Sequence, residues 1–166
     1  ILAAYTSRKN SVDWLNHIDG IWAFALWDPK VGHLILARDP VGVKPLMRTI
    51  PSGGTLLFGS ESKSLRAHPE HIPQLDEEAL VARLAFEYPL DDTTLLKDVH
   101  QVRPGTAEIW ALKENGAKLE SVVTYNREEV APSQHWDSSQ APALLETLTR
   151  SLADRLMYDV PLGIGL

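Results

Sequence analysis

The sequence contains no cysteine, and this absence removes several kinds of chemistry at once. A chain without thiols cannot form disulfides, thiolate zinc sites or iron–sulfur clusters, and it carries no cysteine nucleophile. Proteins of oxidising compartments commonly rely on disulfides. The composition therefore fits a cytoplasmic location, which we expect for this chain.

Long apolar runs and basic clusters are also missing. No apolar stretch approaches the roughly 20 residues that a membrane-spanning helix requires, and no signal peptide is visible. The 16 Lys and Arg residues are outnumbered by 22 Asp and Glu residues, which gives a formal net charge of −6. An acidic chain without a basic stripe repels nucleic-acid phosphates. We expect neither a membrane nor a nucleic acid as a partner.

Metal-binding patterns are absent as well. The six histidines are scattered along the sequence. Only His68 and His71 lie close together, and Pro69 between them breaks the helical spacing of a metal-binding pair. The acidic run 76–78 has a simpler interpretation as favourable charge at a helix N-terminus. We predict no metal site in this chain.

Apolar residues make up 44% of the 166 residues, enough for a sizeable core in one domain or one domain and part of another. The dense β-branched and aromatic runs 21–27 and 33–37 flank a turn at Asp28-Pro29-Lys30 and predict a β-hairpin. We expect the strands between residues 21 and 59 to form one antiparallel layer. Further strands are predicted at 44–50, 55–59, 106–112 and 119–125, and helices at 1–16, 62–67 and 75–88.

The character of the chain changes after residue 125. Residues 126–138 are polar and nearly free of aliphatic side chains, which is typical of a linker. An amphipathic helix is predicted from about Ser139 to Tyr158, followed by a buried strand over the apolar run 160–166. The first residue, Ile1, opens inside an apolar helical pattern and the last residues are apolar. We therefore expect an internal segment of a longer protein.

Five stretches, in the order of that family, together resemble glutamine-hydrolysing asparagine synthetases. They are Gly20–Asp28, Leu36–Leu46 with its Arg-Asp-x-x-Gly-x-x-Pro-Leu pattern, Phe58–Leu65, Leu95–Gly105 and Asp159–Gly163. The resemblance implies an α+β fold in which residues 1–125 form the C-terminal part of an N-terminal-nucleophile (class II) glutamine amidotransferase domain. Residues 126–138 would be the linker, and residues 139–166 the first helix and strand of an α/β ATP-binding synthetase domain.

The family resemblance also implies a reaction for the complete protein. Glutamine is hydrolysed through a cysteine thioester, and the ammonia converts β-aspartyl-AMP, made from aspartate and ATP with Mg²⁺, to asparagine. The family's cysteine and glutamine-binding residues would precede Ile1, so we expect no catalytic residue in this chain and no cofactor bound by it alone. A homodimer is a possible assembly. The alternative is a non-catalytic binding or scaffold module, or the glutaminase-like half of a related β-lactam synthetase or lasso-peptide cyclase.

Gly165 and Leu166 are the residues that the resemblance singles out for nucleotide binding. The family's pyrophosphate loop would follow Leu166, and glycines at 163 and 165 leave room for a ligand to approach the backbone closely. A plain buried strand, in which the glycines allow tight packing, is the alternative interpretation.

Two charged pairs and several tryptophans complete the candidates. Glu61 and Lys63 could be an acid–base pair, but we favour an exposed structural pair. Arg38 and Asp39 could contact glutamine or the ammonia path, but we favour a pair that stabilises a turn and holds strand ends together. The aromatic residues Trp14, Trp22, Trp27 and Trp110 are predicted to be core or interface residues rather than a platform for stacking bases.

Overall fold

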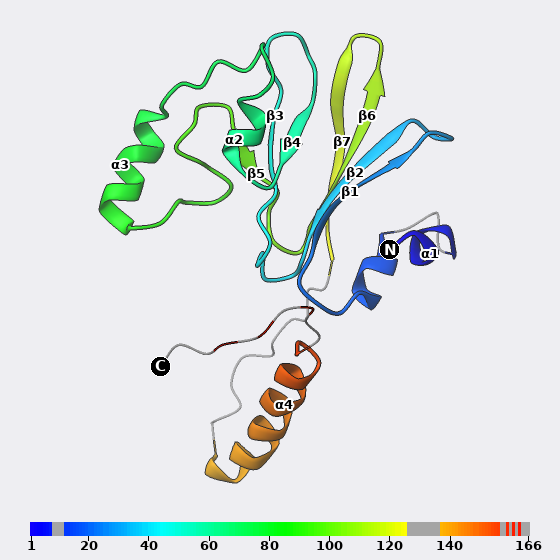
Figure 1. Cartoon of the computed structure of the whole chain (residues 1–166), viewed down its shortest axis with the longest axis vertical. Helices are drawn as coiled ribbons and strands as arrows, with labels where there is room; N and C mark the ends of the chain where they lie inside the picture. Colours follow the sequence, from blue (N-terminus) through cyan, green and yellow to red (C-terminus); the bar gives the residue numbers. More distant parts are fainter. Residues whose placement is uncertain (8–11, 126–136, 157–158, 160, 162, 164–166) are drawn as a thin grey trace. The chain divides into compact units, whose positions relative to one another are not determined.

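The computed structural model describes residues 1–7, 12–125, 137–156, 159, 161 and 163. The chain divides into two compact units, Ile1–Arg127 and Glu128–Leu166. The first unit contains two antiparallel sheets with short helices, and the second contains one longer helix (Figure 1). The predicted mixture of helices and antiparallel strands is confirmed.

The larger sheet has the strand order β1-β2-β6-β7, and each strand is antiparallel to its neighbours. Its strands are β1 (Ala23–Asp28), β2 (His33–Arg38), β6 (Thr106–Lys113) and β7 (Gly116–Thr124). The β1–β2 hairpin confirms the predicted one, with Asp28 opposite His33. Its turn includes Gly32 at φ +70°, a conformation that glycine adopts without strain.

The smaller sheet has the order β4-β3-β5, with β3 (Met47–Thr49), β4 (Leu57–Gly59) and β5 (His100–Gln101). The prediction of a single layer from residue 21 to 59 is therefore wrong. The connection from β2 to β3 carries Pro40 and Pro45, which cannot donate to a sheet ladder, and the chain leaves the first sheet there. The sequence does not predict β5, because two residues are too few for a periodic signal.

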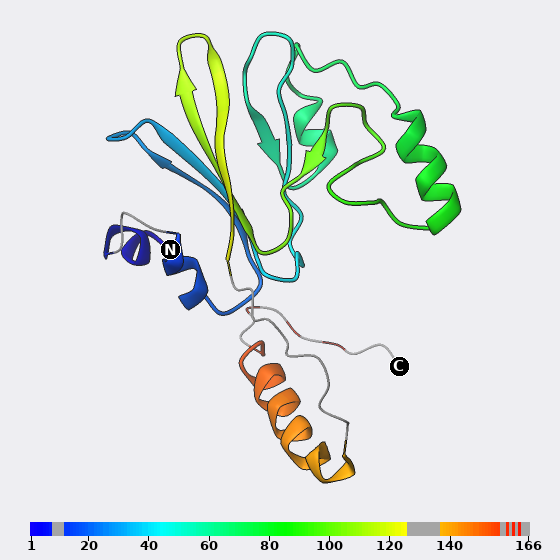
Figure 2. The same ribbon diagram turned by 180° about the vertical axis from the view of Figure 1, so that it is seen from behind.

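Short helices accompany both sheets of the first unit: α1 (Leu2–Ser7), the 3₁₀ helix η1 (Asp13–His17), α2 (Ser62–Leu65) and α3 (Glu77–Phe86). Both views place α1 and η1 near the β1–β2 hairpin, and α2 beside the smaller sheet (Figures 1 and 2). The Tyr5 hydroxyl of α1 donates a hydrogen bond of 2.7 Å to Asp28 Oδ2 at the end of β1. That bond, together with burial and the Asp28 charge, raises the pKa of Tyr5 to about 12, so the hydroxyl remains a donor.

Apolar side chains cover both faces of the larger sheet. One cluster joins Trp14 and Leu15 of η1 to Leu26 and Ile35 of the β1–β2 hairpin. The other packs the opposite face of β2 and β6 against the segments around the smaller sheet, through Leu34, Leu36, Leu46, Val102 and Trp110. Trp14, Trp22 and Trp110 are buried, as predicted for core aromatics, whereas Trp27 is 47% exposed.

Asp76 caps α3, as the sequence predicts, because its carboxylate accepts a hydrogen bond of 2.9 Å from the Ala79 N–H. The Asp76→Ala variant loses this acceptor and should lower the free energy of unfolding by about 1 kcal/mol. Chemical denaturation measures the difference. Asp76→Asn should retain most of the stability, since asparagine caps helices equally well. An equal loss in both variants would contradict this assignment of the cap.

The second unit contains the 3₁₀ helix η2 (Ser138–Gln140) and α4 (Ala141–Ala153). The predicted helix is present, but it ends before the predicted Tyr158. Asp154 follows its last residue, and a negative charge disfavours helix extension at a C-terminus. Five leucines of this unit are exposed, namely Leu144, Leu145, Leu148, Leu152 and Leu156.

The strand predicted for residues 160–166 is not confirmed. Pro161 and Gly163 belong to no strand, and the other residues of this run, including Gly165 and Leu166, lie outside the described residues. Among the helices of the described ranges, none has both the length and the apolar character needed to cross a bilayer.

Candidate functional site

Arg38 is the last residue of β2 and Asp39 follows it, and both are almost fully buried, with exposed fractions of 8% and 1%. Buried charged groups require hydrogen-bond partners. The Arg38 guanidinium donates from Nε to Lys44 O (2.7 Å), from Nη2 to Gly42 O (2.6 Å), and from Nη1 to Val102 O (3.0 Å) and Gln101 Oε1 (3.2 Å). It therefore joins residues 38–45, which we name the Arg38–Asp39 loop, to β5 and the residue after it.

The Asp39 carboxylate organises the same loop from the other side. It accepts hydrogen bonds from the backbone N–H groups of Val41 (3.2 Å), Val43 (3.0 Å) and Lys44 (3.1 Å). Burial acts to raise the pKa of Asp39, but hydrogen bonds from these backbone N–H groups and that of Gly42 outweigh it and hold the pKa below 3.8. The carboxylate is therefore an ionised acceptor rather than a proton donor.

Glycine and tyrosine complete the loop's attachment. Gly42 has φ +71°, and a Cβ there would lie 2.7 Å from Pro104 Cγ and 3.0 Å from Arg38 Cζ, so only glycine fits. The Gly105 N–H donates to Asp39 O at 2.9 Å. The Tyr125 hydroxyl donates to Arg38 O, and burial followed by the Asp39 charge raises its pKa, which keeps the hydroxyl protonated.

This network leaves the Arg38–Asp39 loop rigid while its apolar side chains face solvent. Val41 is 80% exposed and Val43 is 54% exposed. Ile21 is also exposed, and it adjoins Trp22, whose carbonyl accepts a hydrogen bond from the Asp39 N–H. Exposed apolar residues on a fixed frame indicate a contact surface. The prediction that Arg38 and Asp39 stabilise a turn is confirmed, because both charged groups are committed to the frame.

Glu61 and Lys63 form the second charged pair that the sequence singles out. Lys63 Nζ lies 2.6 Å from Glu61 Oε2, and both side chains are largely exposed, so the interpretation as an exposed structural pair is confirmed. Over the described ranges, no group of three or more His, Asp or Glu side chains is arranged to hold a metal ion. The assignment of Gly165 and Leu166 to nucleotide binding stays a prediction.

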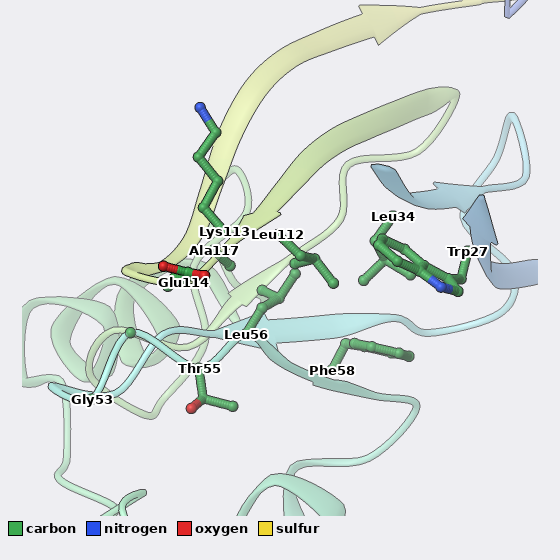
Figure 3. A pocket seen from close by; sticks show the side chains of 12 residues that line it. Trp27, Leu34, Gly53, Thr55, Leu56, Phe58, Leu112, Lys113, Glu114 and Ala117 are labelled. Atoms are coloured by element: carbon green, nitrogen blue, oxygen red, sulfur yellow. The ribbon is translucent and has the colours of Figure 1, made fainter. Parts of the chain in front are cut away.

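A hollow of about 550 Å³ lies between the segment 53–58, which leads into β4, and the larger sheet at the β6–β7 turn. The side chains of Trp27, Leu34 and Phe58 gather around it (Figure 3), and Trp27 and Phe58 are 47% and 41% exposed. Lys113 and Glu114 also line it, but no histidine, cysteine or serine does. An apolar hollow of this composition is typical of a packing surface rather than a catalytic centre.

Sequence reasoning missed a buried ion pair that joins the two sheets. Arg48 Nε of β3 lies 2.6 Å from Glu108 Oε2 of β6, and Glu108 is only 3% exposed. The Trp110 indole N–H donates to the same oxygen at 3.0 Å, and the Arg48 guanidinium lies 5.3 Å from the Trp110 ring centroid. The available signal was a single glutamate inside the apolar run 107–112, which indicates a paired charge in a buried strand.

The first unit of the chain matches a known class of domain. Residues 1–122 match the family model described as a glutamine amidotransferase domain, and the chain belongs to this family. It is 38% identical over 96 residues to asparagine synthetase [glutamine-hydrolyzing] 3 of Bacillus subtilis. The aligned residues make up 57% of this chain and 16% of that protein. The resemblance to glutamine-hydrolysing asparagine synthetases predicted from the five stretches is thereby confirmed over the glutaminase part.

Two further relatives extend over almost the entire chain. Asparagine synthetase [glutamine-hydrolyzing] 1 of Bacillus subtilis is 28% identical over 163 residues, or 98% of this chain and 24% of that protein. Amidase chry2 of Gibberella zeae is 28% identical over 167 residues, or 100% of this chain and 24% of that protein. The chain thus spans between 16% and 24% of the length of these three relatives.

Proposed function

We propose that this chain is part of an ATP-dependent asparagine synthetase that takes ammonia from glutamine. Residues 1–125 would supply the C-terminal part of an N-terminal-nucleophile glutaminase domain, and residues 139–166 the start of the ATP-binding domain. One observation carries this proposal. Similarity to asparagine synthetase 1 covers 98% of the chain, so it continues beyond residue 122, where the glutamine amidotransferase match ends.

In this function the chain contributes a scaffold rather than reacting groups. The complete protein would hydrolyse glutamine to glutamate and ammonia. It would join the aspartate side-chain carboxylate to the AMP part of ATP with release of pyrophosphate, and ammonia would then attack the acyl carbon of β-aspartyl-AMP and release AMP. Mg²⁺ would assist the ATP step, but the described residues do not fit a metal site, because they include no cluster of three potential ligands. The Arg38–Asp39 loop would hold Val41 and Val43 in place as a contact surface for the rest of the protein.

Isotope transfer tests the proposal in the intact protein that contains this chain. With glutamine labelled with ¹⁵N in its side-chain amide, labelled asparagine should form only when ATP, Mg²⁺ and aspartate are all present. Omission of ATP should leave labelled ammonia and glutamate as products. If the ¹⁵N label stays in ammonia when every co-substrate is present, the proposed synthetase function is wrong.

The 166-residue chain alone is expected to release no glutamate from glutamine above the rate of a buffer blank, because the sequence contains no cysteine nucleophile. The intact protein at the same molar concentration is the positive control. A rate that purifies with the isolated chain, and that stays constant per mole of chain through a second chromatographic step, would show that the chain holds a glutaminase site.

Amide formation on another carboxylate is the second candidate. The similarity to Amidase chry2, a relative that is not named as an asparagine synthetase, covers 100% of the chain at the same 28% identity as the synthetase, so the acceptor in this chain's protein need not be aspartate. Mass spectrometry of the ¹⁵N-labelled product separates the two candidates, since only the first requires aspartate. A non-catalytic module would transfer no label to any acceptor. The proposal includes a cytoplasmic location, in agreement with the lack of cysteine, and a homodimer.

A further inference from the structure

A second, smaller pocket lies between α3, the segment 89–96 and strands β3 and β5. Its volume is about 220 Å³, which suits a small metabolite rather than a drug-sized ligand. Its apolar lining includes Met47, Ala79, Pro89 and Leu95. Neither the hollow at the β6–β7 turn nor the Arg38–Asp39 loop shares this lining, and the glutaminase reaction does not account for it.

Arg83 gives this pocket a positive charge. It lies four residues after Ala79, on the same face of α3, and Ala79 is the buried residue of that helix. Its guanidinium has neither an ion pair nor a side-chain hydrogen bond with any residue of the described ranges. A planar guanidinium with free N–H groups matches the two oxygens of a carboxylate.

Gln101 adds a donor whose orientation is fixed by the Arg38 network. Its Oε1 atom faces Arg38 Nη1 at 3.2 Å, and since arginine can only donate, the oxygen of the amide must point that way. Among the described residues, the amide nitrogen, Nε2, then has no hydrogen-bond acceptor, and Gln101 lines the pocket. The Ser62 hydroxyl, also in the lining, likewise has no side-chain partner within the described part of the chain.

The lining is selective as well as cationic, because it includes no aspartate or glutamate. A zwitterionic amino acid would leave its ammonium group without a counter-charge, and an unpaired polar group costs binding energy. Apolar side chains instead favour a compact hydrocarbon body. We propose that this pocket binds a small carboxylate that has a branched or short apolar body and no ammonium group, with Arg83 holding the carboxylate.

Isovalerate is the probe for this site in the intact protein, and saturation-transfer NMR of its methyl groups reports binding. The expected dissociation constant is about 1 mM, as suits a ligand of this size. Arg83→Gln should weaken binding at least tenfold. Arg66→Gln is the matched control, since Arg66 is exposed and does not line the pocket, and it should leave binding unchanged. Arg83→Lys should restore part of the affinity, because the charge returns without the planar fork.

Two close analogues of isovalerate test the ligand class. Isovaleramide lacks the negative charge, and L-valine adds an ammonium group to the same skeleton, so both should bind at least tenfold more weakly. The proposal is wrong if valine binds as tightly as isovalerate. It is also wrong if isovalerate gives no saturation transfer, or if the two arginine variants weaken binding equally.

Discussion

Asp39→Ala is expected to lower the free energy of unfolding by about 3–5 kcal/mol. The substitution removes the acceptor of three backbone N–H groups, those of Val41, Val43 and Lys44. It also removes the negative charge beside the buried Arg38 guanidinium. Since Asp39 is only 1% exposed, water cannot take over these roles without opening the loop. The loop and its link to Val102 should loosen together.

Urea denaturation of the intact protein measures this loss, and Glu61→Ala, at an exposed pair, should change stability by less than about 0.5 kcal/mol. The pKa of Asp39 is lower in the folded state than its ordinary 3.8. The carboxylate's contribution is therefore complete above pH 3.8 and is lost as the pH falls through the folded-state pKa. The difference between the wild type and Asp39→Ala should narrow in acid. A difference that does not change with pH would contradict this role of the carboxylate.

Glu108→Ala is expected to destabilise the protein by about 3 kcal/mol. It leaves the Arg48 guanidinium and the Trp110 indole N–H without their shared acceptor between the two sheets. Arg48 keeps some contact with water and lies 4.0 Å from Asp92, which moderates the loss. Thermal and urea unfolding of the variant measure the size of this loss of stability.

The double variant Arg48→Met with Glu108→Leu provides the sharper comparison. Replacement of both charges by apolar groups removes the unpaired Arg48 charge, but the buried Trp110 indole N–H still loses its acceptor, so the stability of the double variant should lie between those of Glu108→Ala and the wild type. Methionine can also keep contact with the Trp110 ring. A double variant as unstable as Glu108→Ala would mean that the unpaired Arg48 charge does not cause the loss.

The sequence predicts the parts of this fold that depend on interactions between residues close together in the chain. The β1–β2 hairpin follows from two apolar runs around a turn, and the cap of α3 follows from Asp76. The role of Arg38 and Asp39 in a turn is equally local. The partners of Arg38, Gln101 and Val102, lie more than 60 residues away in sequence, so no local pattern could reveal the link to the smaller sheet.

Periodicity is less informative about which face of an element is buried. Leu80, Leu84 and Tyr88 correctly predict a helix, but Leu84 is 76% exposed and α3 packs through the small Ala79 instead. The ion pair of Glu108 was missed for a related reason, because the residue pattern of one strand does not identify the side chains of other elements that pack against it. Gly165 and Leu166 lie outside the described residues. Their predicted role in nucleotide binding depends on the family's pyrophosphate loop, which would follow Leu166.

The position of β1 at the edge of its sheet affects how the isolated chain should behave in solution. Within the described residues, one side of Ala23–Asp28 has no strand beside it, and the run Ala-Phe-Ala-Leu-Trp contains neither charge nor proline. Such an edge is a template on which a second molecule can add its own strand. Concentrated solutions of the isolated chain should therefore form intermolecular ribbons and precipitate, whereas a protein in which other segments cover this edge should stay dispersed.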